Sequence, residues 1–207
     1  MTIDPMVPAR SGRRPGHAVA GFAAGLLGSA VLGLPAGLIW GEVAPRAMLQ
    51  QVSTGAAQLV SPETNAFIGA DAWYSGIAAL AGLLAGVIGY WSLVRVRTDG
   101  SRAAAAGGLI LGAIAGALVM MWLGEQIGLS GYNHHFASSP AGTVYPASLV
   151  LGAKSALAFW PLLTSVVILI AEWNARRNAP AAPVPASAIS GPFGIPPDTG
   201  YGQPPRG

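Results

Sequence analysis

Four ionisable residues lie in or beside long apolar stretches, where a charge is costly. They are Glu42, Asp71, Glu125 and Lys154. Side chains on a helix lean toward its N-terminus, so the ammonium of Lys154 and the two glutamates, on helices of opposite direction, are expected to converge. This polar cluster predicts an ion pair near one membrane surface or the polar entrance of a transport path.

Each member of the cluster also has a plain structural explanation. Lys154, about two turns into its apolar stretch, can extend its ammonium to water or pair with a carboxylate, as an alternative to binding a ligand or a proton. Asp71 directly precedes an apolar stretch, and aspartate is a good N-cap. The sequence therefore indicates a capping role for Asp71 and leaves the role of Lys154 open.

His134 and His135 are the other candidates for chemistry. Adjacent histidines in an extended loop point apart, and a zinc site needs at least a third ligand, for which Glu125 is the nearest candidate. Ordinary loop histidines are the favoured interpretation, and a membrane enzyme with a His134/Glu125 site ranks third among the functions. No catalytic, phosphate-binding or dinucleotide motif occurs, so we expect neither an enzyme nor a cofactor or metal site.

Four apolar stretches must position these residues, and each is long enough to cross a bilayer. They cover residues 18–40, 72–93, 103–123 and 147–170. Hydrophobic residues make up 52% of the 207-residue chain and charged residues only 9%. The fold class predicted is an all-α membrane protein, a bundle of four transmembrane helices over residues 18–175. Lipid is its expected environment, and nucleic acid is excluded as a partner because the basic residues form no continuous stripe.

Arginines flank these stretches asymmetrically. They occur in a basic leader over residues 1–17, between the second and third stretches, and after the fourth, whereas the other two loops contain only Arg46. The positive-inside rule then predicts both termini in the cytoplasm of a bacterial plasma membrane. Residues 176–207, rich in proline and glycine, are expected to form a disordered cytoplasmic tail.

The two remaining loops have room for small structures on the outer side. Residues 47–52 and 56–60 flank a glycine turn and predict a small extracytoplasmic β-hairpin between the first two helices. Residues 124–146 read as an irregular loop. Aromatic residues at the helix ends are expected at the outer membrane boundary. These are Trp40, Trp73, Tyr74, Trp122 and Tyr145.

Glycines recur four residues apart along the apolar stretches, which allows helix backbones to approach closely. The pairs are Gly21/Gly25, Gly33/Gly37, Gly37/Gly41, Gly82/Gly86, Gly108/Gly112 and Gly112/Gly116. These strips predict tight packing, within one chain or with other membrane proteins or copies of itself. Pro35 and Pro161 are expected to kink their helices, with Trp160 in the middle of the fourth stretch.

Two local motifs carry a family resemblance. Gly37-Leu38-Ile39-Trp40 with Ala44-Pro45, and Gly69-Ala70-Asp71-Ala72-Trp73-Tyr74, resemble an uncharacterised family of actinobacterial four-pass membrane proteins over residues 18–170. The resemblance implies architecture and plasma-membrane location, without an activity. The function expected is a non-enzymatic accessory or interaction component of the envelope. The alternative is a small transporter or channel with an outer entrance formed by Glu42, Glu125 and Lys154.

Overall fold

The computed structural model describes residues 15–62, 64–95 and 99–179. The chain divides into two units, Met1–Trp173 and Asn174–Gly207. The described part of the second unit is the end of the last helix, where the Asn178 side-chain amide donates to Asn174 Oδ1 at 3.1 Å. The predicted tail lies mostly, and the predicted leader almost wholly, outside the described residues.

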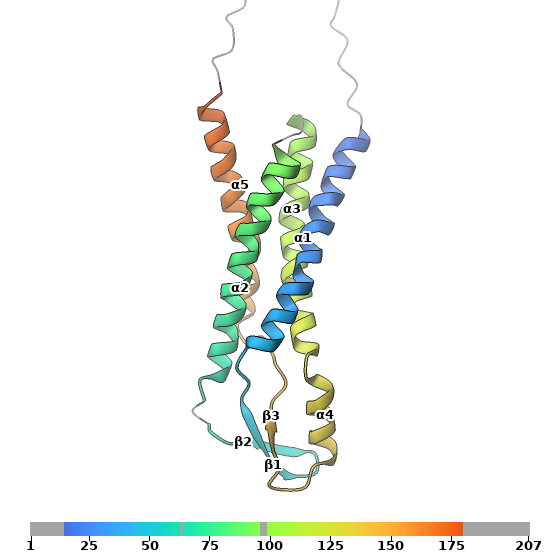
Figure 1. Cartoon of the computed structure of the whole chain (residues 1–207), viewed down its shortest axis with the longest axis vertical. Helices are drawn as coiled ribbons and strands as arrows, with labels where there is room; N and C mark the ends of the chain where they lie inside the picture. The colour runs from blue at the N-terminus through green and yellow to red at the C-terminus, as the bar shows by residue number, and fades with distance from the viewer. Residues whose placement is uncertain (1–14, 63, 96–98, 180–207) are drawn as a thin grey trace, which may run out of the picture. The chain divides into compact units, whose positions relative to one another are not determined.

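The described part of the chain contains four helices long and apolar enough to cross a membrane (Figure 1). They are built from α1 (Pro15–Val43), α2 (Ala66–Gly89) with the π-helical turn η1 (Tyr90–Val94), α3 (Asp99–Gln126), and the 3₁₀ turn η2 (Lys154–Ala158) with α5 (Phe159–Arg177). The predicted fold class is confirmed, and the chain is a multi-pass membrane protein. Pro35 lies inside a continuous α1, whereas Pro161 lies in the first turn of α5, where a helix has no use for its missing N–H.

The glycine strips of α1 and α3 pack against each other within the chain. A Cβ added to Gly33 or Gly37 of α1 would meet the carbonyl oxygen of Gly116 or Met120. In the other direction, a Cβ at Gly112 would lie 2.6 Å from the carbonyl oxygen of Leu26. Only residues without a side chain allow two backbones this close in lipid, where dispersion contacts replace the hydrophobic driving force.

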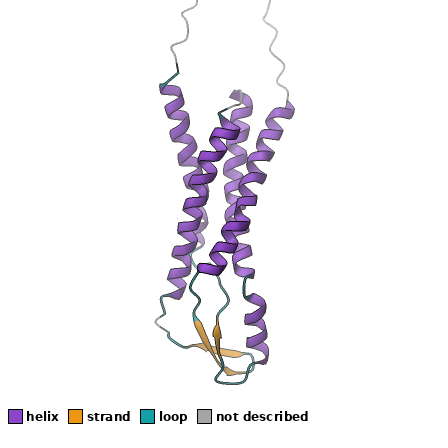
Figure 2. Ribbon diagram, viewed as in Figure 1, coloured by secondary structure: helices purple, strands orange, loops and turns teal. Residues whose placement is uncertain are grey.

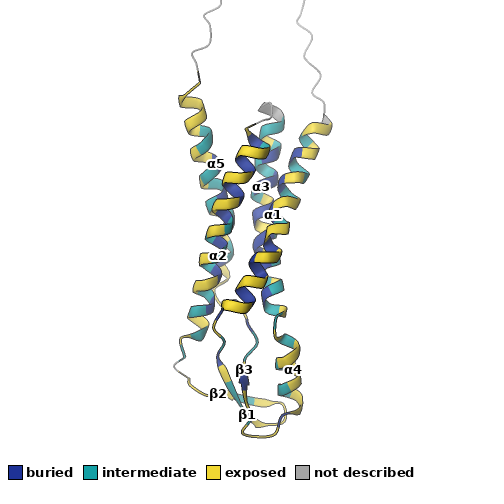
Figure 3. Cartoon of the chain, in the orientation of Figure 1, coloured by how far each residue is buried: buried dark blue, intermediate teal, exposed yellow. Residues whose placement is uncertain are grey.

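A second glycine contact joins α2 to α5. A Cβ on Gly82 would lie 2.6 Å from the carbonyl oxygen of Trp160, and the Thr164 hydroxyl donates to the Gly82 carbonyl at 3.0 Å. Figure 3 shows the buried residues of the helices on the faces that they turn to one another. The predicted close packing thus arises between helices of one chain.

Aromatic side chains form the centre of the core near the end of α1. Trp40 and Tyr74 are fully buried, meet edge to face at 5.1 Å between ring centroids, and donate to the carbonyls of Ala70 and Ala117 at 2.9 and 2.7 Å. Both side chains face the core, where backbone carbonyls of neighbouring helices satisfy their polar atoms, and their place at the depth of the membrane boundary stays a prediction. Trp73 and Trp122 are exposed, as boundary residues would be.

A small sheet and a short helix form a cap at the end of the helices where α1 ends and α2 begins (Figure 2). The cap comprises β1 (Met48–Ser53), β2 (Ala56–Leu59), β3 (Val144–Pro146) and α4 (Leu129–Ser138). The predicted hairpin is confirmed as β1 and β2, and β3 pairs antiparallel with the other edge of β1. The prediction of an irregular loop over 124–146 is wrong, since it contains α4 and β3.

Candidate functional site

An extended segment leads from the cap into the helices. We call residues 147–153 the strap. The strap carries the buried side chains of Leu149 and Leu151 into the aromatic core, and helical structure begins only at Lys154. The predicted start of the fourth helix near residue 147 is therefore wrong, and Lys154 opens the 3₁₀ turn instead of lying two turns inside. Pro161 explains part of this. It cannot donate a hydrogen bond to the carbonyl of Leu157, so the regular α-helix does not extend back past Phe159.

Two carboxylates from other helices hold the strap by its backbone. Asp71 accepts from the N–H groups of Gly152 and Ala153 at 3.0 and 2.9 Å, and Glu125 Oε1 accepts from Leu151 N–H at 3.1 Å. Irregular backbone is tolerated near the membrane only where its polar groups are satisfied by protein or water. The carboxylates meet this requirement for the N–H groups of residues 151–153, and their charge also suits the positive end of the helix that follows.

Asp71 does not cap its own helix, so the predicted capping role is wrong. Helix α2 begins at Ala66 with Asn65 in the N-cap position, and this places Asp71 in the second turn. The prediction failed because the apolar pattern of residues 66–70 is too short to be distinguished from a loop by composition. The aspartate instead satisfies donors from a segment 81 and 82 residues away.

Lys154 and Glu125 lie close together, whereas Glu42 lies apart. The Lys154 ammonium is 3.9 Å from Glu125 Oε1 and 3.7 Å from Met121 Sδ. Its side chain is 59% exposed and that of Glu125 is 26% exposed, so the pair is expected to contribute less than about 1 kcal/mol. Glu42 is exposed, and no cation of the described residues lies within ion-pair distance of it. Within this polar cluster, Asp71 and Glu125 bind the backbone of the strap, and this is the role that the geometry supports.

Both candidate histidines lie on α4, not in an extended loop. The His135 ring stacks on Tyr145 with centroids 5.3 Å apart, and its Nδ1 lies 3.1 Å from Ser139 Oγ. His134 is exposed, with its ring 5.9 Å from that of His135. Among the described residues, no group of three or more histidine, cysteine, aspartate or glutamate side chains could hold a metal ion.

A buried polar contact orders the interior of the cap. Tyr145 OH donates to Gln51 Oε1 at 2.6 Å, and the Gln51 amide donates to the carbonyls of Ser53 and Phe136 at 2.7 and 3.0 Å. Burial, aided by the nearby phenol of Tyr132, raises the pKa of Tyr145, so the phenol remains a donor at neutral pH. These contacts fix β1, β3 and α4 together, and no local pattern in the sequence marks Gln51.

Arg46 joins two helix ends below the cap. Its Nη2 donates to the carbonyls of Gly41, near the end of α1, and Ile127, just after α3, at 2.6 and 3.1 Å. Backbone carbonyls at a helix C-terminus lack intrahelical partners and carry partial negative charge, which a cation stabilises. The arginine therefore has a structural reason for its position.

One face of the sheet is not covered by any of the residues that the structure describes. We call it the bare sheet face, made of Met48, Gln50, Gln58, Val60, Val144 and Pro146, which the strand register places on one side. Met48, Val60 and Val144 are each slightly more than half exposed, whereas Gln51 and Tyr145 on the opposite face are buried. No charged side chain lies on the bare sheet face.

The structure thus defines a class of protein, a four-span membrane protein with a small sheet-and-helix cap at one end. No protein-family model, no curated protein and no solved structure matches the chain.

Proposed function

We propose that this protein is a non-enzymatic accessory component of a bacterial, and by its sequence motifs actinobacterial, cell envelope that binds another envelope protein through its cap. The bare sheet face is the observation that supports this. Apolar side chains gathered on a rigid face mark interaction sites more often than isolated exposed residues do. Four apolar side chains and two amides suit an uncharged protein surface that supplies apolar contacts and backbone hydrogen-bond partners.

Docking requires a rigid surface, and the inner side of the sheet supplies it. Gln51 and Tyr145 tie neighbouring strands together from beneath, while α4 covers the same side through the Phe136 carbonyl. Because few groups need to be ordered on binding, most of the contact free energy remains available for affinity. The hydrogen bonds of Gln51 and Tyr145 thus keep the bare sheet face rigid.

Substituting Val144 with lysine is expected to reduce partner retention at least about tenfold, because a charge is left unpaired in an apolar contact. Asn133→Lys, which adds the same charge to an exposed site on α4, is the matched control and should retain the partner. The measurement is quantitative mass spectrometry of proteins co-purified from native membranes. A photo-crosslinking residue at position 60 should capture the same partner. Equal retention by both variants, or crosslinks to lipid alone, would contradict the proposal.

We also propose that the cap faces the extracytoplasmic side. Arginines near the opposite ends of the helices support this orientation, and Arg46 does not count against it because helix carbonyls hold its side chain. Reporter fusions after Arg177 should give a cytoplasmic signal, and fusions at Gly55 in the β1–β2 turn should give a periplasmic one. A cytoplasmic signal at Gly55 would overturn the orientation.

A small transporter with an entrance at Glu42, Glu125 and Lys154 remains the competing hypothesis. The exposed Lys154 ammonium near Glu125 favours it. However, Glu125 is engaged with the strap, and Glu42 lies outside the pair. Ion or solute flux into proteoliposomes that Lys154→Met abolishes would favour transport over docking.

A further inference from the structure

A groove lies between α1 and α2 in the membrane-spanning part of the protein, and Leu109 of α3 contributes to its floor. It encloses about 270 Å³. Exposed residues form its rim, among them Ala24, Gly28 and Ile88, whereas buried residues form its floor. The floor residues are Gly25, Ser29, Ala85, Gly89 and Leu109. The groove therefore opens toward lipid, and an occupant would enter it from the bilayer.

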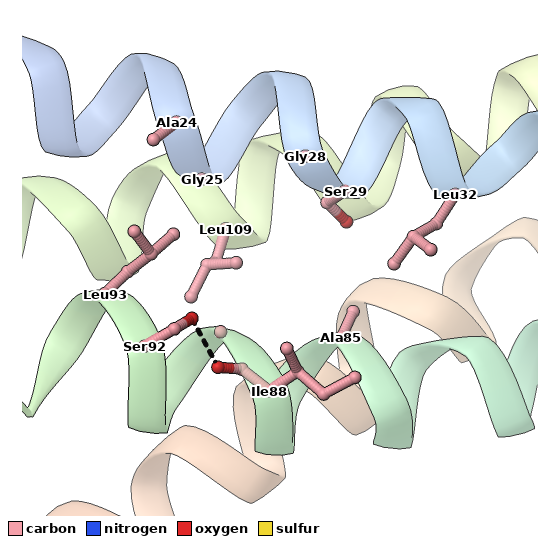
Figure 4. Close-up of a pocket in the computed structure, with 11 residues that line it drawn as sticks. Ala24, Gly25, Gly28, Ser29, Leu32, Ala85, Ile88, Ser92, Leu93 and Leu109 are labelled. Atoms are coloured by element: carbon pink, nitrogen blue, oxygen red, sulfur yellow. Dashed lines mark hydrogen bonds between the residues drawn. The ribbon is translucent and has the colours of Figure 1, made fainter.

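Ser29 places a hydroxyl group in this largely apolar groove. Its side chain is directed from α1 toward the gap that separates it from α2 (Figure 4), it is only 2% exposed, and its hydroxyl has no hydrogen-bond partner. The residue lies at the middle of α1, about 21 Å from either end at a rise of 1.5 Å per residue. At that depth water cannot satisfy the hydroxyl, so a partner must come from protein or from an occupant.

The helix geometry at one end of the groove differs from that of an ordinary span. Residues Tyr90–Val94 form a π-helical turn, which places Ser92 and Leu93 among the groove residues. The Ser92 hydroxyl donates to the Ile88 carbonyl at 2.6 Å, which leaves Ser29 as the donor available to an occupant (Figure 4).

We infer that the groove binds an elongated, uncharged lipid that carries a carbonyl oxygen within its hydrocarbon part. The groove encloses only about 270 Å³, a volume that suits part of a single hydrocarbon chain and not a transmembrane helix about 10–12 Å across. An ordinary phospholipid has its oxygens at the membrane surface and cannot reach Ser29 with them. A carbonyl in the hydrocarbon region can accept from the Ser29 hydroxyl while the remainder of the chain contacts the alanines, glycines and leucines.

The test measures lipid retained by the purified full chain in phosphatidylcholine nanodiscs, by native mass spectrometry. One probe is a phosphatidylcholine with a ketone near the middle of one acyl chain, and a second is a prenylquinone. The reference lipid is the same phosphatidylcholine without the ketone. We expect the ketone lipid or the quinone to be preferred over the reference by about fivefold, the value of one neutral hydrogen bond. The probe that is preferred identifies the source of the carbonyl.

Two variants separate the hydroxyl from the groove. Ser29→Ala should abolish the preference while leaving the chain folded. Gly28→Leu should prevent retention of either probe, because a Cβ at Gly28 has open space around it and the side chain would fill the groove. Gly76→Leu, at another open glycine outside the groove, is the control and should bind as the unsubstituted chain does. A preference unchanged in Ser29→Ala, or no preference for either probe in the unsubstituted chain, would overturn the inference.

Discussion

Replacing Gly112 with leucine is expected to lower the free energy of unfolding by about 3 kcal/mol or more, at the upper end of the overpacking range or above it. A Cβ at this position would lie 2.6 Å from the carbonyl oxygen of Leu26, 2.7 Å from that of Gly25 and 2.8 Å from the Leu26 Cα. Backbone atoms inside a helix cannot rotate away as a side chain can. The two helices would have to separate along their whole contact, and neighbouring glycine contacts would be lost with it.

Thermal unfolding in detergent, followed by circular dichroism, measures this effect. Gly112→Ala should already destabilise, and Gly112→Leu should destabilise further. The matched control is Gly107→Leu, since a Cβ at Gly107 has nothing within 4 Å. Both glycines lie on α3, so the comparison removes the effect of leucine's helix propensity. Equal melting temperatures for Gly107→Leu and Gly112→Leu would mean that α1 and α3 do not pack through this strip.

The same contact shows why the sequence predicts helix packing only in part. Glycines four residues apart identify a surface that can approach another helix, because this property belongs to each helix alone. The partner of each strip depends on how both helices are rotated. Gly82 meets α5 and Gly112 meets α1, although both belong to strips with the same spacing. The spacing of glycines along one helix does not indicate which of the other helices that helix contacts.

The strap and β3 could be predicted from the sequence even less than the helix packing could. Hydropathy reports whether a segment is apolar, and the strap is as apolar as the helix that follows it, so the sequence predicts residues 147–153 as part of the fourth helix. Its extended backbone is possible only because Asp71 and Glu125, distant in sequence, accept its N–H groups. Strand β3 is likewise defined by its pairing with β1, whereas the β1–β2 hairpin has a glycine turn with φ +76° at Gly55 as a local signal.

The charged residues likewise have one contact that local geometry predicts and others that depend on residues distant in sequence. The tilt of side chains along their helices predicts that Lys154 and Glu125 approach each other, and they lie 3.9 Å apart. The tilt does not reveal which backbone donors compete for the carboxylates. Because backbone N–H groups lie closer to Asp71 and Glu125 than the ammonium does, the strap is expected to depend on the carboxylates more than on the lysine.

Asp71→Ala is therefore expected to lower the free energy of unfolding by about 2–4 kcal/mol, because it removes two hydrogen bonds to a charged acceptor and leaves two N–H groups without a protein partner. The strap should loosen from the core, so that Leu149 and Leu151 lose part of their burial. Asp71→Asn should have a smaller effect, since the amide oxygen can still accept one of the two bonds. Hydrogen exchange of a peptide covering the strap should be faster in Asp71→Asn than in the unsubstituted chain, and faster still in Asp71→Ala.

Lys154→Met is the comparison that separates the carboxylates' backbone contacts from the ion pair. It removes an exposed pair expected to contribute less than about 1 kcal/mol, and Glu125 keeps its bond to Leu151. We expect near-normal melting and unchanged exchange in the strap. If Lys154→Met loosened the strap as much as Asp71→Ala does, the ammonium would be its anchor. If neither variant changed the exchange, burial of Leu149 and Leu151 alone would hold the segment in place.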